Sequence, residues 1–239
     1  MTISSKTNRH LTEIRRLAGA AARARSGRFV AEGEDLVGAA DAAGISAVYE
    51  LCARGAGCAR RPRAVEVEPE LLAAVSSLGS GSRIVGVYEQ RWAERVDGPL
   101  AIALWGVRDP GNVGTVIRAA QAFGAASVGL GPGCADPYGP KAVRASMGAI
   151  FLRRIARFGS VDELPGRVVA LVAGARERLL GPVDGELTLL VGSERSGLPG
   201  EVLEQCDQVR SIAQVAGDSL NAAMAATVGL YEVTRMADR

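Results

Sequence analysis

Hydrophobic and polar positions alternate along the first ninety residues in a way that predicts both helices and strands. Apolar side chains recur every three or four positions over 11–27 and again before Gly44, which is typical of amphipathic helices. Short apolar runs between them predict strands. One predicted strand starts at Phe29, and three others cover 47–53, 64–69 and 83–90. A further helix is predicted over 69–78. This alternation predicts a small α/β unit with a parallel or mixed sheet.

The second half has longer apolar runs. Residues 100–107 and 187–191 are almost continuously apolar, as expected for strands that are buried on both faces. Predicted helices follow the turn at 109–112, begin after Pro140, and cover 222–236 with Ser219 as N-cap; 126–133 reads as a strand and turn. Residues 91–99 are polar and end in Gly-Pro, so they predict a linker. The pattern therefore predicts two α/β domains, 1–90 and 100–239.

Composition narrows the class of protein. The chain has 239 residues, 48% of them hydrophobic and 23% charged, which are ordinary values for a globular protein. Its apolar runs are too short to span a bilayer and its N-terminus lacks the apolar region of a signal peptide, so we expect a cytoplasmic protein without membrane association. Four cysteines without C-x-x-C spacing, together with a single histidine, predict reduced structural thiols and no metal site.

Charge is distributed unevenly. Residues 1–30 hold seven basic side chains and one acidic side chain, a net charge of +6, whereas the rest of the chain carries −4. A basic arm on a mildly acidic body indicates binding to a phosphate backbone, although a solvated helix end would have the same composition. The candidate RNA-binding residues are Arg9, Arg15, Arg16, Arg28 and, on the predicted helix after Pro140, Arg144. For Arg144, an ordinary surface helix position is an equal alternative.

Three segments in the second half place Gly, Ser or Asn where an apolar run ends. They are DPGNVGTVIRAAQAFGA (109–125), LLVGSERSGLPGEV (189–202) and SIAQVAGDSLNAAMAATVGLYE (211–232). The edge at which parallel strands end is where open α/β sheets bind ligands. Each segment alone has a plainer interpretation, because an Asn or Ser can simply cap a helix and an Arg or Glu can simply face water.

Taken together and in this order, the three segments resemble the SpoU-type (TrmH-like) RNA ribose methyltransferases of the SPOUT class. The resemblance covers roughly 100–236. It implies an α/β fold with a SPOUT-type C-terminal domain and a C-terminal trefoil knot, S-adenosylmethionine (AdoMet) as cofactor, and a homodimer. The segment FVAEGEDLVGAA resembles, more loosely, the small N-terminal RNA-binding domain of many such enzymes.

The resemblance also assigns residues. It implies that Gly192 lies in the loop that cradles AdoMet and that Ile212 and Leu220 line the adenine pocket. The residues that it places at the reaction are Asn112, Arg118, Glu194, Ser219 and Asn221. A guanidinium is a poor base, so we prefer for Arg118 a role in binding phosphate and stabilising developing charge, close to the cofactor of the other subunit, although the family is often described with this Arg as the base. Ala213 and a short 212–219 loop depart from the family pattern.

The function predicted from the sequence is methyl transfer from AdoMet to a ribose 2′-hydroxyl of structured RNA, with ribosomal RNA favoured over transfer RNA. One alternative is an RNA-binding protein of the same fold that has lost the chemistry. The full set of residues assigned to the reaction argues against it. The other alternative is a small-molecule α/β enzyme, which the absence of G-x-G-x-x-G after the first strand of either half disfavours.

Overall fold

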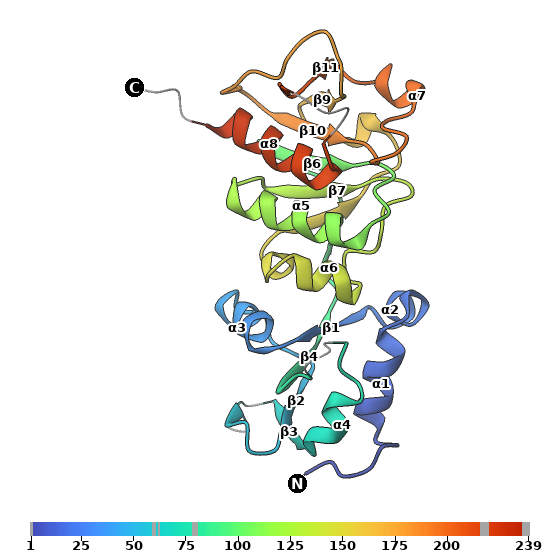
Figure 1. Cartoon of the computed structure of the whole chain (residues 1–239), viewed down its shortest axis with the longest axis vertical. Coiled ribbons are helices and arrows are strands. Elements are labelled where there is room, and N and C mark those ends of the chain that lie inside the picture. Colours follow the sequence, from blue (N-terminus) through green and yellow to red (C-terminus); the bar gives the residue numbers. More distant parts are fainter. Residues whose placement is uncertain (1, 59–60, 62, 78–80, 216–219, 236–239) are drawn as a thin grey trace. The chain divides into compact units, whose positions relative to one another are not determined.

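The computed structural model describes residues 2–58, 61, 63–77, 81–215 and 220–235. Contacts divide the chain into two compact units, shown in Figure 1. One unit comprises Met1–Gln90 with Asp136–Phe151, and the other comprises Arg91–Ala135 with Leu152–Arg239. Each unit is built on its own sheet.

The first unit contains a four-stranded mixed sheet. Strand β4 pairs antiparallel with β1 and with β2, and β2 pairs parallel with β3. The strands are β1 (Arg28–Glu32), β2 (Tyr49–Ala53), β3 (Ala64–Val67) and β4 (Ile84–Glu89). Its helices are α1 (Arg9–Leu17), α2 (Ala20–Ser26), α3 (Glu34–Ala42), α4 (Pro69–Ala73) and α6 (Pro140–Ala145). Leu11, Ile14 and Leu17, the predicted apolar stripe of α1, are all buried.

The helix predicted over 11–27 is two helices, because the chain turns at Gly19. Gly19 has extended backbone angles and forms the N-cap of α2. The carbonyls of Leu17 and Ala18, left free where α1 ends, both accept hydrogen bonds from Nη1 of Arg23 at 2.8 Å. The break is therefore completed by a side chain from the following helix.

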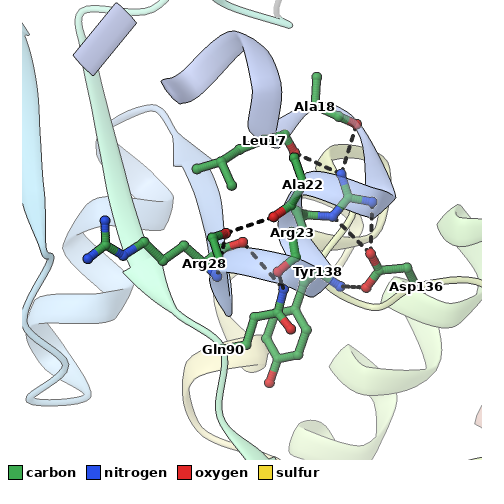
Figure 2. A network of polar contacts seen from close by, with 9 residues as sticks. Leu17, Ala18, Ala22, Arg23, Arg28, Gln90, Asp136 and Tyr138 are labelled. Atoms are coloured by element: carbon green, nitrogen blue, oxygen red, sulfur yellow. Dashed lines mark hydrogen bonds and ion pairs between the residues drawn. The ribbon is translucent and has the colours of Figure 1, made fainter. Parts of the chain in front are cut away.

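Arg23 is a structural residue, although the sequence placed it among the basic side chains of the N-terminal arm. Its side chain is buried, and Nε and Nη2 each lie 2.8 Å from Oδ2 of Asp136. Figure 2 shows the guanidinium directed at this carboxylate. Oδ1 of Asp136 accepts a hydrogen bond from the backbone N–H of Tyr138. A buried charge requires such pairing, so Arg23 is not available to RNA.

Residues 136–151 were predicted as part of the C-terminal domain, but their contacts lie in the first unit. Helix α6 packs against β1. The ring of Phe29 lies 4.9 Å from that of Tyr138, and the ring of Tyr88 lies 4.9 Å from that of Phe151. Gly148 approaches α3 so closely that a Cβ there would lie 2.4 Å from Cβ of Ala39.

The second unit is a seven-stranded parallel sheet in the order β11-β9-β10-β6-β7-β8-β5. Its strands are β5 (Trp92–Ala93), β6 (Leu100–Leu104), β7 (Ser127–Leu130), β8 (Arg154–Arg157), β9 (Arg167–Leu171), β10 (Leu187–Val191) and β11 (Gln208–Arg210). Helices α5 (Pro110–Ala122) and α8 (Ala222–Thr234) pack side by side, and α7 covers Gly200–Leu203. Strand β10 is buried throughout, as its apolar run predicts. Both units confirm the predicted α/β class.

The segment 91–99 is not a free linker. It contains β5, which pairs with β8 at the edge of the sheet, and the side chain of Val96 is buried in the core of the second unit. The threading of a C-terminal knot stays a prediction, because residues 216–219 lie outside the described part of the chain. Among the described helices, none combines the length and the apolar character that a membrane crossing needs.

The expectation that all cysteines are reduced is wrong for one pair. Cys52, in β2, and Cys58, in the turn that follows, form a disulfide. Their Cα atoms lie 6.0 Å apart, a separation that a disulfide can span although the spacing is not C-x-x-C. Cys134 and Cys206 are free thiols.

Candidate cofactor and catalytic site

Four neighbouring strands of the second unit end in one row. The parallel register places Val191 at the end of β10 beside Leu104 of β6 and Leu171 of β9, and pairs Leu171 with Arg210 of β11. The loops that follow these strands therefore start at the same edge of the sheet. The segment 109–125 starts in the loop after β6, the segment 189–202 runs from β10 into the loop that follows it, and the segment 211–232 starts directly after β11.

The turn after β6 is organised by Asp109. Its Oδ1 accepts hydrogen bonds from the backbone N–H groups of Gly111 at 2.7 Å and Asn112 at 3.1 Å, and Pro110 occupies the first turn of α5. The interpretation of Asn112 as a simple N-cap is therefore wrong. Its side chain is left free to make contacts across the site.

Asn112, Glu194 and Asn221 are joined in one chain of hydrogen bonds. Nδ2 of Asn112 donates to Oε1 of Glu194, and Nδ2 of Asn221 donates to Oδ1 of Asn112 at 3.3 Å. The three residues come from three different segments, and the structure brings together three of the five predicted catalytic residues. The Asn112 amide thus donates through its NH₂ group to a carboxylate and accepts through its oxygen from the Asn221 amide, and these two bonds fix its orientation.

Asn221 also begins α8. Its Oδ1 accepts hydrogen bonds from the backbone N–H groups of Ala223 at 2.9 Å and Met224 at 3.4 Å. The predicted N-cap was Ser219, whereas the N-cap is Asn221; the first residue of the helix, Ala222, is as predicted. Ser219 itself lies outside the described residues. Because its oxygen is held by the helix, Asn221 can direct only its NH₂ group into the site.

A cavity of about 350 Å³ lies on one side of the loop that follows β10. It is lined by apolar and small side chains with a few polar groups. The lining includes all three residues predicted to contact the cofactor, Gly192, Ile212 and Leu220, with Leu171, Leu198 and Glu194. A cavity of this size with both apolar and polar lining residues suits a nucleoside-like ligand.

Gly192 is required by the backbone of this loop. A Cβ at position 192 would lie 2.3 Å from the carbonyl carbon of Gly197 and 2.6 Å from the nitrogen of Leu198. The turn is closed by hydrogen bonds in both directions between the backbones of Ser193 and Gly197, at 3.2 Å and 3.0 Å, and Gly197 has φ of +62°. A side chain at position 192 would therefore clash with the loop backbone, and one at position 197 would strain it.

A larger cavity, of about 960 Å³, lies against the same loop. Asn112, Glu194 and Asn221 line it, so the hydrogen-bonded chain faces this space, and Glu194 also lines the smaller cavity. Sequence reasoning missed three further lining residues, Trp105, Arg108 and Arg195. Trp105 and Arg108 lie between a buried strand and the turn at Asp109. Their position at the end of a strand could have marked them as candidate site residues.

Neither metal nor thiol chemistry is supported at this edge. Among the residues that the structure describes, no three His, Cys, Asp or Glu side chains come close enough to hold a metal ion. Burial raises the pKa of the Cys134 thiol, and the nearby charge of Glu194 raises it further, so that this thiol is neutral. The polar side chains that line the cavities are amides, carboxylates, serine hydroxyls and guanidinium groups.

Comparison with known proteins decides the family. The model of the SpoU rRNA methylase family matches residues 99–231, more than half of the chain. The chain belongs to the SpoU rRNA methylase family. This confirms the resemblance seen in the three segments and makes the protein a member of a family of AdoMet-dependent RNA 2′-O-methyltransferases of the SPOUT class.

Three relatives of this SpoU-family protein illustrate the match. A 23S rRNA (uridine(2479)-2′-O)-methyltransferase of Streptomyces viridochromogenes is 34% identical over 71% of the chain, which spans only 61% of that relative. The 23S rRNA (guanosine(2553)-2′-O)-methyltransferase RlmP of Bacillus subtilis is 29% identical, covering 97% of this chain and 98% of its own. The crystal structure of an AdoMet-bound rRNA methyltransferase from Sinorhizobium meliloti superposes with a TM-score of 0.86 and 30% identity, covering 98% and 97% of the two chains.

Arg118 is apart from the other predicted catalytic residues of this SpoU-family protein. It is exposed on α5, six residues after Asn112, which places it about 9 Å further along the helix axis and on a different face. Among the described residues that line the two cavities, Arg118 does not appear. One subunit alone therefore does not bring its guanidinium to Glu194.

The candidate RNA-binding arginines of the first unit are in different environments. Arg9 and Arg16 line a groove of about 560 Å³ along α1 and α2, together with Arg25. Arg28 forms an ion pair with Glu13 at 2.9 Å, so its charge is already compensated. Arg15 is exposed and donates to the carbonyl of Lys6 at 3.1 Å, and Arg144 is exposed on α6. The Arg28–Glu13 pair is already counted in the net +6 of residues 1–30, so it is the pairing of Arg23 with Asp136 that lowers the uncompensated positive charge of the arm.

Proposed function

We propose that this protein transfers the methyl group of AdoMet to a ribose 2′-hydroxyl of ribosomal RNA. The observation that carries the proposal is the position of the Asn112–Glu194–Asn221 chain, at the boundary of two cavities that share one loop. The smaller cavity suits the cofactor and the larger one suits a nucleotide. Two relatives are named as 2′-O-methyltransferases of 23S rRNA, which supports ribosomal over transfer RNA.

The residues around the smaller cavity fit AdoMet. Gly192 keeps the loop backbone free of side-chain atoms, and Ile212 and Leu220 supply apolar surface for an adenine ring. When bound there, AdoMet supplies an electrophilic methyl group on a sulfonium. Glu194 lines both cavities, so its carboxylate lies where a ribose hydroxyl from the larger cavity would meet that methyl group.

The hydrogen-bonded chain orients the hydroxyl. Asn112 donates to one oxygen of the Glu194 carboxylate, and the second oxygen is left to accept a hydrogen bond from the 2′-hydroxyl. Asn221 holds Asn112 in place through its NH₂ group. Fixing the hydroxyl in line with the methyl group removes rotational freedom before the reaction, which is a large part of the rate enhancement available to such a site.

Single-turnover transfer of radiolabelled methyl from AdoMet to purified ribosomal RNA tests this function. We expect label in the RNA with the wild-type protein, and a rate lower by on the order of a hundredfold with Asn112→Ala, because one preorganised hydrogen-bonding partner is removed. Ribose methylation mapped in cells with and without the gene identifies the nucleotide. Binding of AdoMet and RNA with no transfer of label would favour the alternative, an RNA-binding protein without activity.

A homodimer would complete the site. Met224, Val228 and Tyr231 lie on one face of α8 and are 57%, 39% and 55% exposed, a stripe of apolar surface that a second copy of the chain would cover. Because α8 packs beside α5, docking of a second copy on this stripe would bring α5 near the interface. Arg118 would then act in the active site of the other subunit, where it would bind the RNA phosphate and stabilise the developing alkoxide.

Mixed dimers test this assignment. Arg118→Ala alone should lower methyl transfer by on the order of a hundredfold, and Arg118→Lys should restore little, since an ammonium cannot bind a phosphate through two parallel hydrogen bonds. Subunits carrying Arg118→Ala, mixed with subunits carrying Gly192→Val, should recover about a quarter of wild-type activity, because half of the dimers then hold one complete site. No recovery in mixtures shown to exchange subunits would place Arg118 in its own subunit's site.

The first unit would bind the RNA. Arg9 and Arg16 line the groove along α1 and α2, and Arg15 is exposed beside it. Cationic side chains along a groove are the arrangement expected for phosphate contacts. The relatives described above come from bacteria, in which ribosomal RNA is made in the cytoplasm, so we place the protein there.

A further inference from the structure

The larger cavity contains a tryptophan that the mechanism above does not use. Trp105 is the first residue after β6, and its backbone N–H donates to the carbonyl of Val191 at 2.9 Å. The indole is half-buried, in contrast to the buried side chains of the core cluster that it packs against. Of the described residues that line this cavity, Trp105 is the aromatic one.

The indole is held rigidly on its buried side. Its ring centroid lies 5.8 Å from that of Phe158, with the planes inclined at 58°. A Cβ on Gly131 would lie 3.0 Å from Cε3 of Trp105 and 2.8 Å from Cζ of Phe158, so glycine leaves room for both rings. The remaining part of the indole lines the cavity, and a ring fixed in this way loses little entropy when a ligand stacks on it.

Two arginine side chains line the same cavity as Trp105. Arg108 and Arg195 both line the cavity and are exposed, and Arg108 lies three residues from Trp105. An aromatic ring with nearby guanidinium groups is the combination by which proteins hold single-stranded nucleic acid, since bases stack on the ring and phosphates pair with the cations. The methyl-accepting hydroxyl would meet Glu194, which lines this same cavity.

We propose that Trp105 is the platform on which the base of the target nucleotide stacks, with Arg108 and Arg195 binding the phosphates on either side. The proposal rests on the function proposed above and adds a property of the substrate. A base that stacks on an indole has left its own helical stack, so the accepted nucleotide is unpaired or is turned out of its helix on binding. Trp105 is thus a substrate-positioning residue.

Two substitutions of Trp105 separate stacking from packing. Trp105→Phe keeps an aromatic face, whereas Trp105→Leu keeps apolar contact with Phe158 and removes that face. We expect Trp105→Leu to lower kcat/KM for RNA by about tenfold to a hundredfold, the effect of losing one base–aromatic stack, and Trp105→Phe to keep most of the activity. AdoMet affinity should be unchanged in both. Equal kcat/KM for the Leu, Phe and wild-type proteins would overturn the proposal while leaving the function standing.

Fluorescence supplies a test that needs no turnover. The chain has two tryptophans, and the other one, Trp92, lies in the edge strand β5 with the Arg157 guanidinium 4.5 Å from its ring centroid. In Trp92→Phe only Trp105 emits, and a single-stranded oligoribonucleotide should quench it. The control Trp105→Phe leaves only Trp92, whose emission should not change.

The two measurements keep the failures distinct. If wild-type protein methylates no ribosomal RNA, the proposed function fails, and quenching of Trp105 by the oligoribonucleotide would still support the platform. If the wild type is active but neither kinetics nor quenching depends on Trp105, the platform fails alone. A fully paired duplex of the same sequence serves as the second ligand and should quench Trp105 less than the single strand does.

Discussion

Replacing Arg23 with alanine should destabilise the first unit more than any other change to a basic residue of the N-terminal arm. The Arg23 side chain is only 5% exposed, and its guanidinium bonds to Asp136 and to the carbonyls of Leu17 and Ala18 (Figure 2). Alanine removes all of these contacts at once. The carboxylate of Asp136 would be left without its cation, and two carbonyls at the end of α1 would lose their donor.

The size of the effect follows from the burial of these groups. Removing one partner of a buried ion pair lowers the free energy of unfolding by about 3–5 kcal/mol. Asp136 is 27% exposed at its side chain, so water can solvate part of the uncompensated charge and the loss should lie near the lower end. We expect a decrease of about 3 kcal/mol, which is a large part of the roughly 5–15 kcal/mol that stabilises a typical domain.

Urea denaturation followed by circular dichroism measures this change. Arg25→Ala is the matched control, because Arg25 is on the same helix and exposed, and its substitution should change stability by less than about 0.5 kcal/mol. Asp136→Asn is the second variant: it keeps an acceptor for the backbone N–H of Tyr138 but removes the charge. Equal unfolding midpoints for Arg23→Ala and Arg25→Ala would refute the view that Arg23 is a structural residue.

Three further predictions follow from the geometry. Gly192→Ala should weaken AdoMet binding, measured by calorimetry, by at least about tenfold, because the new Cβ would force the loop backbone to move. An unchanged affinity for AdoMet would contradict this prediction. The double variant Arg15→Glu, Arg16→Glu should bind RNA more weakly and with a smaller salt dependence than the wild type, and its AdoMet binding should be unchanged. A salt dependence equal to that of the wild type would mean that these α1 side chains face solvent and do not contact RNA. Burial lowers the pKa of His10 below its ordinary 6.5, so the folded state binds this proton less well than the unfolded state, and stability should fall as pH drops through about 6.5. His10→Gln should remove that part of the pH dependence of unfolding, and an unchanged profile would contradict it.

Local patterns were enough to predict much of the protein. The buried strands β6 and β10 are continuous apolar runs, and the apolar stripe of α1 has helical spacing, so periodicity alone located them. Asn112, Glu194 and Asn221 stood out because polar residues at strand ends are positioned for binding. Their grouping was expected only through the family resemblance, since neither periodicity nor spacing says which loops meet.

Tertiary structure decided the features that depend on partners far away in the chain. Arg23 is separated from Asp136 by 113 positions, and nothing around Arg23 distinguishes it from its exposed neighbour Arg25. Likewise, Asp109 rather than Asn112 caps α5, because both residue types favour N-caps and only the backbone path selects one.

In the candidate site, too, some residues could be found from the sequence and others only from the tertiary structure. The sequence was enough to locate the loop after β10, since its glycines at 192 and 197 are typical of a tight turn. Trp105 read as part of an apolar strand, and its role depends on which side of its ring is covered. Phe158 and Gly131 cover one side and the cavity lies on the other, and both facts come from the packing of strands that are distant in sequence. Hydrophobic periodicity records whether a residue is apolar, whereas the fold decides what that residue faces.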